Sequence, residues 1–269
     1  MNEKKKAAQL RRDVLEMLYA CQSGHPGGSL SCIEILTTLF YGTMRGRSPE
    51  DPENPDRDRF VLSKGHACPV LYAILADQGY FPREDLRHLR QIDSHLQGHP
   101  DFTKTPGVDM NTGSLGQGAS LAMGLALAAK HGGRSCRVYA LLGDGECQEG
   151  LVWEAAMAAS HYRLDNLTFL LDNNGLQLDG ETKQVMSLGD VAEKFAAFGF
   201  QCHTVDGHNT AELAEALAAP AEGRPKLICC NTVKGKGVSF MENNADWHGK
   251  PMTEEQFRQA IREVEAEYE

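Results

Sequence analysis

The sequence predicts one α/β domain over residues 1–269, built as a doubly wound, mostly parallel sheet with helices on both faces. Three observations predict this fold. Short apolar runs alternate with segments of helical periodicity along the chain. Polar, glycine-rich clusters follow two of those runs directly, at the strand ends where open α/β sheets bind ligands. The length allows a complete core, and no internal repeat, low-complexity tract or interdomain linker divides the chain.

The first part of the chain begins with helices and reaches the first strand late. Apolar residues at helical spacing predict helices near 7–21 and 31–44, with the loop SGHPGGS between them. A surface loop rich in Pro, Asp and Glu follows at 47–58. The apolar run at 60–62 predicts a brief strand that opens onto the loop SKGH, and helical periodicity returns at 67–78.

The middle of the chain holds the clearest strand–helix–strand pattern. Residues 94–118 form a long irregular loop dense in Gly, His and Pro, and loops of this length in compact domains are usually functional or disordered. The small residues of 117–130 predict a helix that packs closely on a sheet. Apolar runs at 136–142 and 167–171 predict buried strands, with a helix at 149–161 between them.

The last part of the chain continues the alternation. Helices are expected near 187–198 and 210–219, and strands near 200–205 and 226–233. A final loop and a charged C-terminal helix are expected at 234–251 and 253–268. Strands that alternate with helices in this way favour one layered α/β domain.

Composition narrows the class of protein. Charged residues make up 24% and hydrophobic residues 41%, as in ordinary globular proteins, and the net charge of −10 argues against a nucleic-acid partner. The eight cysteines are scattered without a CxxC pair, which favours reduced thiols. The N-terminus lacks a continuous apolar segment, so neither a signal peptide nor a membrane span is expected. We expect a cytoplasmic protein without a membrane partner.

The most specific pattern is GDG, 27 residues and then NN. Glycines flank Asp144, so the backbone can turn sharply and approach a ligand closely. Asn174 follows the next strand, and both polar clusters are expected at one edge of a parallel sheet. One carboxylate, one side-chain amide and a nearby main-chain carbonyl suit Mg²⁺ or Ca²⁺ when a phosphate completes the shell. A lone GDG is also an ordinary tight turn.

Several other loops carry residues with two interpretations. His25, His66, His99 and His248 each lie beside Gly or Pro in a loop. A single loop histidine is more often a surface residue or a helix cap, whereas four near a metal–phosphate pattern can bind hydroxyls or phosphates and move protons. The turns GSLGQG and KGKG are either ligand-facing backbone or plain turns. Glu149 and Glu154 also suit the start of a helix.

The motifs together resemble a known family. The GDG–NN spacing resembles the thiamine diphosphate signature, and SGHPGGS, LSKGHA, GHPD, TGSLGQG, GDGECQEG, LDNNGL, VKGKG and DWHGKP occur in order. The chain resembles the cofactor-binding N-terminal half of transketolase over nearly its whole length, so thiamine diphosphate and Mg²⁺ (or Ca²⁺) are the implied cofactors.

The resemblance assigns roles to matching positions. The implied metal ligands are Asp144, Asn174 and the carbonyl of Leu176. The implied cofactor-binding residues are Lys64, His66, Gly113, Ser114, Leu115, Gly145, Glu149, Lys234 and His248. His25 and His99 would face the substrate as the catalytic residues. Glu149 and Glu154 would lie near the contact between two diphosphate-binding domains and couple their active sites.

One departure from the family sets an expectation about partners. A full transketolase continues into a pyrimidine-binding domain, which supplies the glutamate that protonates the aminopyrimidine ring, and then into a C-terminal domain. The resemblance therefore implies one subunit of a split transketolase that acts on sugar phosphates. Its partner would be a C-terminal subunit with those two domains, in a dimer of heterodimers. A related split synthase, a transketolase for an unusual sugar, and a non-catalytic cofactor-binding protein remain alternatives.

Overall fold

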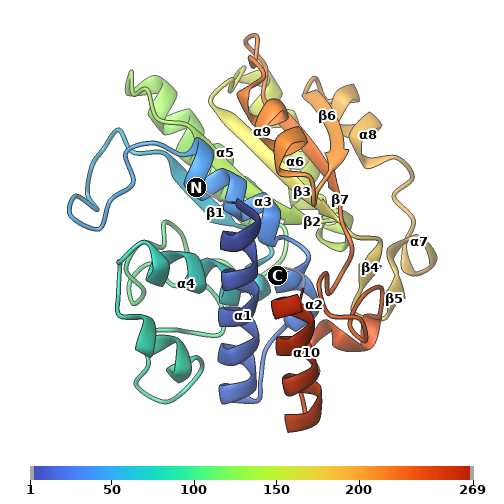
Figure 1. Cartoon of the computed structure of the whole chain (residues 1–269). Helices are drawn as coiled ribbons and strands as arrows, with labels where there is room; N and C mark the ends of the chain where they lie inside the picture. The colour runs from blue at the N-terminus through green and yellow to red at the C-terminus, as the bar shows by residue number, and fades with distance from the viewer. Residues whose placement is uncertain (1–2, 267–269) are drawn as a thin grey trace.

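A five-stranded parallel sheet lies at the centre of the molecule, with helices on both faces (Figure 1). The computed structural model describes residues 3–266. The strands are β1 (Arg59–Leu62), β2 (Val138–Gly143), β3 (Leu167–Asn173), β6 (Gln201–Asp206) and β7 (Lys226–Asn231). Their order in the sheet is β1-β2-β3-β7-β6, and every pairing is parallel. The predicted α/β fold class is confirmed.

Alternate side chains of the strands face two separate cores. Leu62, Tyr139 and Leu141 point into one core, whereas Val61, Ala140 and Leu142 point into the other. This period of two is what a strand buried on both faces requires. The first core is covered by α1 (Glu3–Cys21), α3 (Ile33–Thr38), α4 (Cys68–Asp77) and α9 (Thr210–Ala218), and the second by α5 (Gln117–His131), α6 (Gly150–His161) and α8 (Val191–Ala197).

The first and last helices lie side by side (Figure 1). Helix α10 (Glu254–Ala266) packs along α1, and the rings of Tyr19 and Phe257 stack with centroids 4.2 Å apart. Leu10, Val14, Met17 and Leu18 bury the inner face of α1. The N-terminal helix is therefore part of the core.

The structure corrects several predicted elements. The loop SGHPGGS contains a short helix, α2 (Pro26–Leu30), and the helix predicted at 31–44 is split into α3 and a π-helix (Leu39–Thr43). The helix predicted at 187–198 is only α8, and the strand predicted at 136–142 begins at Val138. Residues 267 and 268 of the predicted last helix lie outside the described residues.

Other corrections concern short elements that sequence periodicity does not reveal. A 3-10 turn (Gly145–Gln148) precedes α6, and Glu149 between them has an extended backbone rather than a helical one. A small hairpin of β4 (Leu176–Gln177) and β5 (Gly180–Glu181) follows β3 and leads into α7 (Thr182–Val185). Further 3-10 turns occur at Gly65–Ala67, Arg83–His88 and Ala245–His248. The irregular loop predicted at 94–118 is confirmed, since it contains no helix or strand before α5 begins at Gln117.

Two further observations concern the chain as a whole. Within residues 3–266, no helix combines the length and the apolar character needed to cross a bilayer. All eight cysteines are free thiols, and most are buried. A buried thiol packs as a small apolar side chain, and five of the cysteines belong to the two cores: Cys32, Cys68, Cys147, Cys229 and Cys230.

Candidate active site

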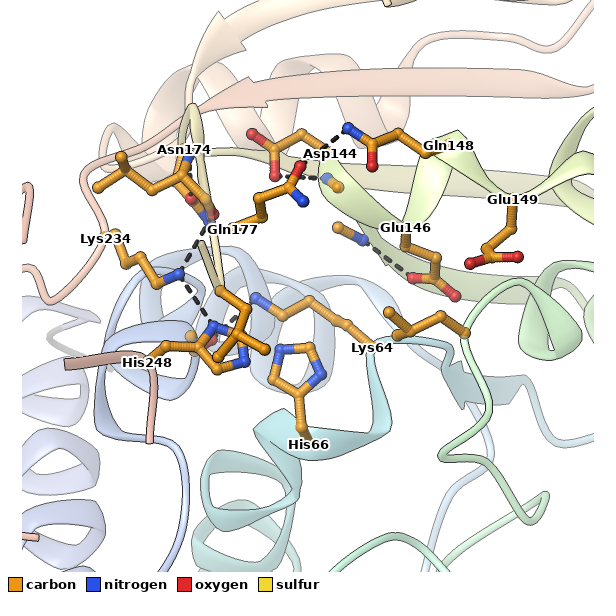
Figure 2. Close-up of a pocket in the computed structure, with 16 residues that line it drawn as sticks. Lys64, His66, Asp144, Glu146, Gln148, Glu149, Asn174, Gln177, Lys234 and His248 are labelled. Carbon is orange, nitrogen blue, oxygen red and sulfur yellow. Dashed lines mark hydrogen bonds between the residues drawn. The ribbon is translucent and has the colours of Figure 1, made fainter. Parts of the chain in front are cut away.

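The C-terminal ends of four adjacent strands meet at one edge of the sheet and line a cavity of about 270 Å³. Gly143 pairs with Asp172 and Asn173 with Asn231, so the residues that follow β2, β3 and β7 emerge together. β1 ends at Leu62 and delivers Ser63 and Lys64 to the same edge. Figure 2 shows the basic side chains of this cavity on one side and Asp144, Glu146 and Glu149 on the other. The fold thus brings together polar residues that are distant in the sequence.

The three predicted metal ligands lie around one turn. Asp144 is 5% exposed, and its carboxylate accepts hydrogen bonds from the backbone N–H groups of Gly145 (2.8 Å) and Gly175 (2.6 Å). The Asn174 Oδ1 accepts the N–H of Leu176 at 3.1 Å, which closes the turn that follows β3. This turn therefore packs against the Asp144 carboxylate. Asp144, Asn174 and Leu176 all line the cavity.

The Asp144 carboxylate is held in an environment that favours its protonation. Burial, and then the nearby Asp172 carboxylate, raise the pKa of Asp144. A bound cation would relieve both effects. Within residues 3–266, no group of three or more His, Cys, Asp or Glu side chains is arranged to hold a metal ion.

A buried ion pair lies beneath the cavity. Asp172 is fully buried, and it accepts hydrogen bonds from Lys64, from Thr232 and from Ser31 (2.5 Å). Lys64 also donates to the carbonyl of Gly28 at 2.8 Å. Burial opposes both charges, but the attraction of the pair holds the pKa of Asp172 below and that of Lys64 above its usual value. Lys64 is therefore locked in place as a cation.

Lys234 is a buried cation of a different kind. Its side chain is 2% exposed and donates to the Leu176 carbonyl at 3.2 Å and to the Nδ1 of His248 at 3.1 Å. No carboxylate within residues 3–266 forms an ion pair with it. Burial, and then the charge of Lys64, lower the pKa of Lys234 to about 8. A buried ammonium without a countercharge is poised to accept an anion.

Three imidazole rings cluster beside the lysines. The centroids of His25, His66 and His248 lie 5.1 to 5.3 Å from one another. Burial is the main reason that the pKa of His25 and that of His248 fall to about 4, and it also lowers that of His66 strongly. All three rings are therefore neutral near pH 7. Because the His248 Nδ1 accepts from Lys234, its Nε2 carries the proton.

Two glycines of α2 allow these side chains to approach one another. A Cβ on Gly27 would lie 2.9 Å from the Trp247 carbonyl and 3.1 Å from Cγ of Lys234. A Cβ on Gly28 would lie 3.2 Å from the Nε2 of His66. The HPGG sequence thus lacks the side chains that would keep Lys234 and His66 away from α2, which explains why the motif is rich in glycine.

The predicted substrate-facing residues lie next to the main cavity without lining it. His25 packs against the rings of His66 and His248, and its Nδ1 is buried without a hydrogen-bond partner. His99 packs on the turn before α5, since a Cβ on Gly113 would lie 3.0 Å from its Cγ. Burial and the charge of Arg90 lower the pKa of His99. The two histidine loops and the turn are therefore neighbours.

The remaining predicted residues divide by position. Leu115 lines the cavity with 38% of its surface exposed, and Gly145 and Glu149 also line it. Gly113 and Ser114 belong to the same turn as Leu115 but do not line the cavity. Glu149 is exposed at the cavity edge, and Glu154 is exposed on α6 away from it.

Sequence reasoning missed several residues of the cavity. Glu146, Gln148 and Gln177 line it, and Gln148 donates to the Gln177 side chain at 2.8 Å. Glu146 is 2% exposed, and its carboxylate accepts hydrogen bonds from three donors. Its position two residues after Asp144 is the one sequence signal for it, since it places the glutamate beside a predicted metal ligand.

Comparison with known proteins supports the resemblance. The family described as "Transketolase, thiamine diphosphate binding domain" matches residues 2–267. The chain is 45% identical over 260 residues to SqwG, a 6-deoxy-6-sulfo-D-fructose transketolase subunit of Clostridium sp. (strain MSTE9), covering 96% of this chain and 94% of that protein. It is 41% identical over 256 residues to one subunit of the apulose-4-phosphate transketolase of Phocaeicola vulgatus, covering 94% of this chain and 90% of that protein.

Solved structures give the same result at the level of the fold. The transketolase of Leishmania mexicana superimposes with a TM-score of 0.92 at 32% sequence identity. The alignment covers 98% of this chain but only 41% of that protein. The chain therefore spans about two fifths of the length of the solved transketolases it matches.

Proposed function

This chain belongs to the family of transketolase thiamine diphosphate-binding domains, and we propose that it is the cofactor-binding subunit of a two-chain transketolase. The enzyme would move a two-carbon glycolaldehyde unit from a ketose, typically a ketose phosphate, to an aldose. The observation that carries the proposal is the cavity itself. There, a buried lysine that forms no ion pair within residues 3–266 lines the cavity together with Asp144, Asn174 and Leu176, and with the neutral imidazoles of His66 and His248.

Asp144 after β2 and the turn after β3 together fit a divalent metal ion. Asp144, the Asn174 amide oxygen and the Leu176 carbonyl supply hard oxygen ligands with a single negative charge, as Mg²⁺ or Ca²⁺ prefers. The raised pKa of Asp144 supports a bound cation, because an unpaired buried carboxylate is unfavourable. Diphosphate oxygens would complete the shell, and Mg²⁺ is the ion we propose.

The basic side of the cavity fits the diphosphate. Lys234 and the Nε2–H of His248 would donate to phosphate oxygens, and the backbone N–H of Gly145 lies at the same edge. Lys64 and His66 would complete this side, with Glu149 at its rim. The turn Gly113–Ser114–Leu115 would hold the ring portion of the cofactor, since Leu115 supplies an apolar surface to the cavity.

His25 and His99 would act on the substrate. When bound, the cofactor supplies the electron sink for cleavage of the bond between C2 and C3 of the ketose. The two neutral imidazoles would donate hydrogen bonds to the substrate carbonyl and hydroxyls and would move protons. The unpartnered Nδ1 of His25 supports this role, because a buried polar atom without a partner is rare.

A second polypeptide would complete the active site. The two relatives of nearly equal length are named as subunits of transketolases, which supports a split enzyme. We propose that the partner carries the pyrimidine-binding and C-terminal domains and that two such pairs associate. We also propose a cytoplasmic location, because eight free thiols suit a reducing compartment.

The ketose donor is open within this proposal. The relatives act, by their names, on 6-deoxy-6-sulfofructose and on apulose 4-phosphate, so an unusual sugar is a second candidate beside ordinary pentose and hexose phosphates. The test is to purify the chain with its partner and to assay a panel of ketoses with ribose 5-phosphate as the acceptor. Transfer from any donor that requires both chains, Mg²⁺ and thiamine diphosphate supports the proposal. Cofactor binding without transfer from any donor would support a non-catalytic binding protein instead.

A further inference from the structure

We infer that Glu146 is a positioning residue. It holds residues 113–116, the turn proposed to face the ring portion of the cofactor, at a fixed distance from the turn at Asp144, which is proposed to bind the metal. This inference rests on the proposed function, because it concerns how the two parts of one cofactor site are kept in register. Glu146 belongs to the 3-10 turn after Asp144 and lines the cavity. It is not among the residues assigned above to the metal, the diphosphate or the substrate.

Three segments of the chain meet at the Glu146 carboxylate. Its Oε1 accepts the hydroxyl of Ser63, at the end of β1, and the backbone N–H of Gly116 at 2.8 Å. Its Oε2 accepts the backbone N–H of Gly143, at the end of β2, at 3.0 Å. All three neighbours donate, so the ionised carboxylate satisfies every bond. Burial raises the pKa of Glu146 and the three donors oppose that rise.

The hydrogen bond to Gly116 is the important one. Within residues 3–266, it is the single hydrogen bond that ties residues 113–116 to a distant segment of the chain. Those residues include Leu115, which lines the cavity. Removing the acceptor therefore frees the turn that faces the ring portion of the cofactor.

Glycines set the turn against the loop that follows β1 and leave it without side-chain anchors. A Cβ on Gly118 would lie 2.4 Å from the Ser63 Oγ, and a Cβ on Gly65 would lie 2.9 Å from the backbone N of Gly113. Gly116 itself has φ +84°, where a side chain is strained, and a Cβ there would lie 2.9 Å from Cβ of Glu149. These glycine contacts are purely steric, so the hydrogen bond from Gly116 to Glu146 fixes the position of the turn.

Glu146→Asp separates the two ends of this link. The shorter side chain draws the carboxylate back toward its own backbone. We expect Gly143, three residues earlier in the same turn, to follow it, whereas Gly116 belongs to a separate segment that cannot follow. Inorganic diphosphate needs the metal and lysine side of the site alone, whereas thiamine diphosphate needs both sides.

The experiment is a calorimetric titration of the assembled two-chain enzyme with thiamine diphosphate and Mg²⁺. Inorganic diphosphate is measured by competition, and the control variant is Glu193→Asp, whose side chain is exposed on α8.

We expect Glu146→Asp to weaken thiamine diphosphate binding about tenfold or more, the effect of a buried donor that loses its acceptor. Inorganic diphosphate affinity should stay within about threefold, and turnover at saturating cofactor should recover to within about threefold of the wild type. Glu193→Asp should change neither. Equal losses for both ligands, no loss, or turnover that stays low at saturation would overturn the inference.

A second variant keeps the test independent of side-chain length. Glu146→Gln is isosteric, but its amide group leaves either the Gly116 or the Gly143 N–H facing another donor. Amide hydrogen exchange of residues 112–118 or 143–145 should then accelerate, while residues 201–206 on the far strand should not change. Unchanged exchange in both segments would contradict the inference. If the wild type binds no thiamine diphosphate with Mg²⁺, the proposed function fails first.

Discussion

Asp144 supplies the whole negative charge of the proposed metal site, so its loss should be more severe than the loss of Asn174. We expect Asp144→Ala to weaken metal-dependent thiamine diphosphate binding by several kcal/mol, as for a lost charged contact, and Asn174→Ala to weaken it less. Calorimetry of the two-chain enzyme with Mg²⁺ measures both variants. If Asp144→Ala binds thiamine diphosphate with wild-type affinity, Asp144 is not the metal ligand.

Lys234 should take up a proton when a diphosphate binds. Its pKa of about 8 means that about half of the ammonium groups are deprotonated at pH 8, and a polyanion beside it would raise that pKa. Titration of thiamine diphosphate at pH 8 in two buffers of different ionisation enthalpy should therefore report an uptake of about half a proton. Lys234→Met should abolish the uptake. An uptake that is the same in wild type and variant would place the proton elsewhere.

His25 and His99 should affect turnover and leave cofactor affinity unchanged. Replacement of either by Ala should lower kcat about 10²- to 10⁴-fold if the imidazoles act as acid and base. His66→Ala and His248→Ala should instead weaken cofactor binding, because these two rings line the cavity. Steady-state kinetics at saturating cofactor, with calorimetry on the same samples, separates the two effects. Identical donor kinetics in wild type and His25→Ala would show that His25 has another role.

The charge state of His25 gives a further check in solution. Burial lowers its pKa to about 4, so in the free protein the ring stays neutral as the pH falls through 6.5, where an ordinary imidazole is half protonated. Ring chemical shifts in an NMR titration should therefore move near pH 4. This low pKa also means that acid weakens the fold, since the unfolded chain binds the proton first.

Single residues differ in how well the sequence reveals them. Asp144 and Asn174 follow strand-like runs at a diagnostic spacing, so their position at one edge of the sheet is predictable. Glu146 is not, because its role depends on Ser63 and Gly116, and no local pattern shows that these three residues meet. Asp172 belongs to a visible polar cluster, but its ion pair with Lys64 requires the register of the sheet.

At the scale of elements, the start of α5 shows how closely helix and sheet approach. A Cβ on Gly118 would lie 2.4 to 2.6 Å from Ser63, whereas a Cβ on Gly124 in the same helix meets nothing within 4 Å. We expect Gly118→Ala to lower the free energy of unfolding by about 1–3 kcal/mol through overpacking. Gly124→Ala should leave it unchanged or raise it by up to about 1 kcal/mol through helix propensity. Urea unfolding of the two variants measures the difference, and equal effects would contradict the close contact.

Elements with strong periodicity are predicted well, and short ones are missed for physical reasons. The bounds of α5, α9 and β3 differ from prediction by two residues or fewer. Helix α2 is not predicted, because Gly27 and Gly28 are poor helix formers. Packing of these glycines against Lys234 and His66 stabilises the helix despite its low propensity. The hairpin of β4 and β5 has two residues per strand, which is too short for a pattern to appear.

At the scale of the whole molecule, the alternation of strands and helices predicts a parallel sheet but not the order of its strands. β7 lies between β3 and β6, so the last strand of the chain is internal and the preceding one forms the edge. That order brings Thr232 to Asp172 and Lys234 to the Leu176 carbonyl. The site thus depends on a long-range arrangement that local sequence patterns do not contain.

The central claim is that this chain supplies one wall of a cofactor site that a second polypeptide completes. The most direct test is hydrogen–deuterium exchange at the thiazolium C2 position of thiamine diphosphate, followed by NMR with Mg²⁺. We expect slow exchange with this chain alone and an acceleration of several orders of magnitude when the partner is added. Rapid exchange and ketose cleavage by the isolated chain would contradict the claim.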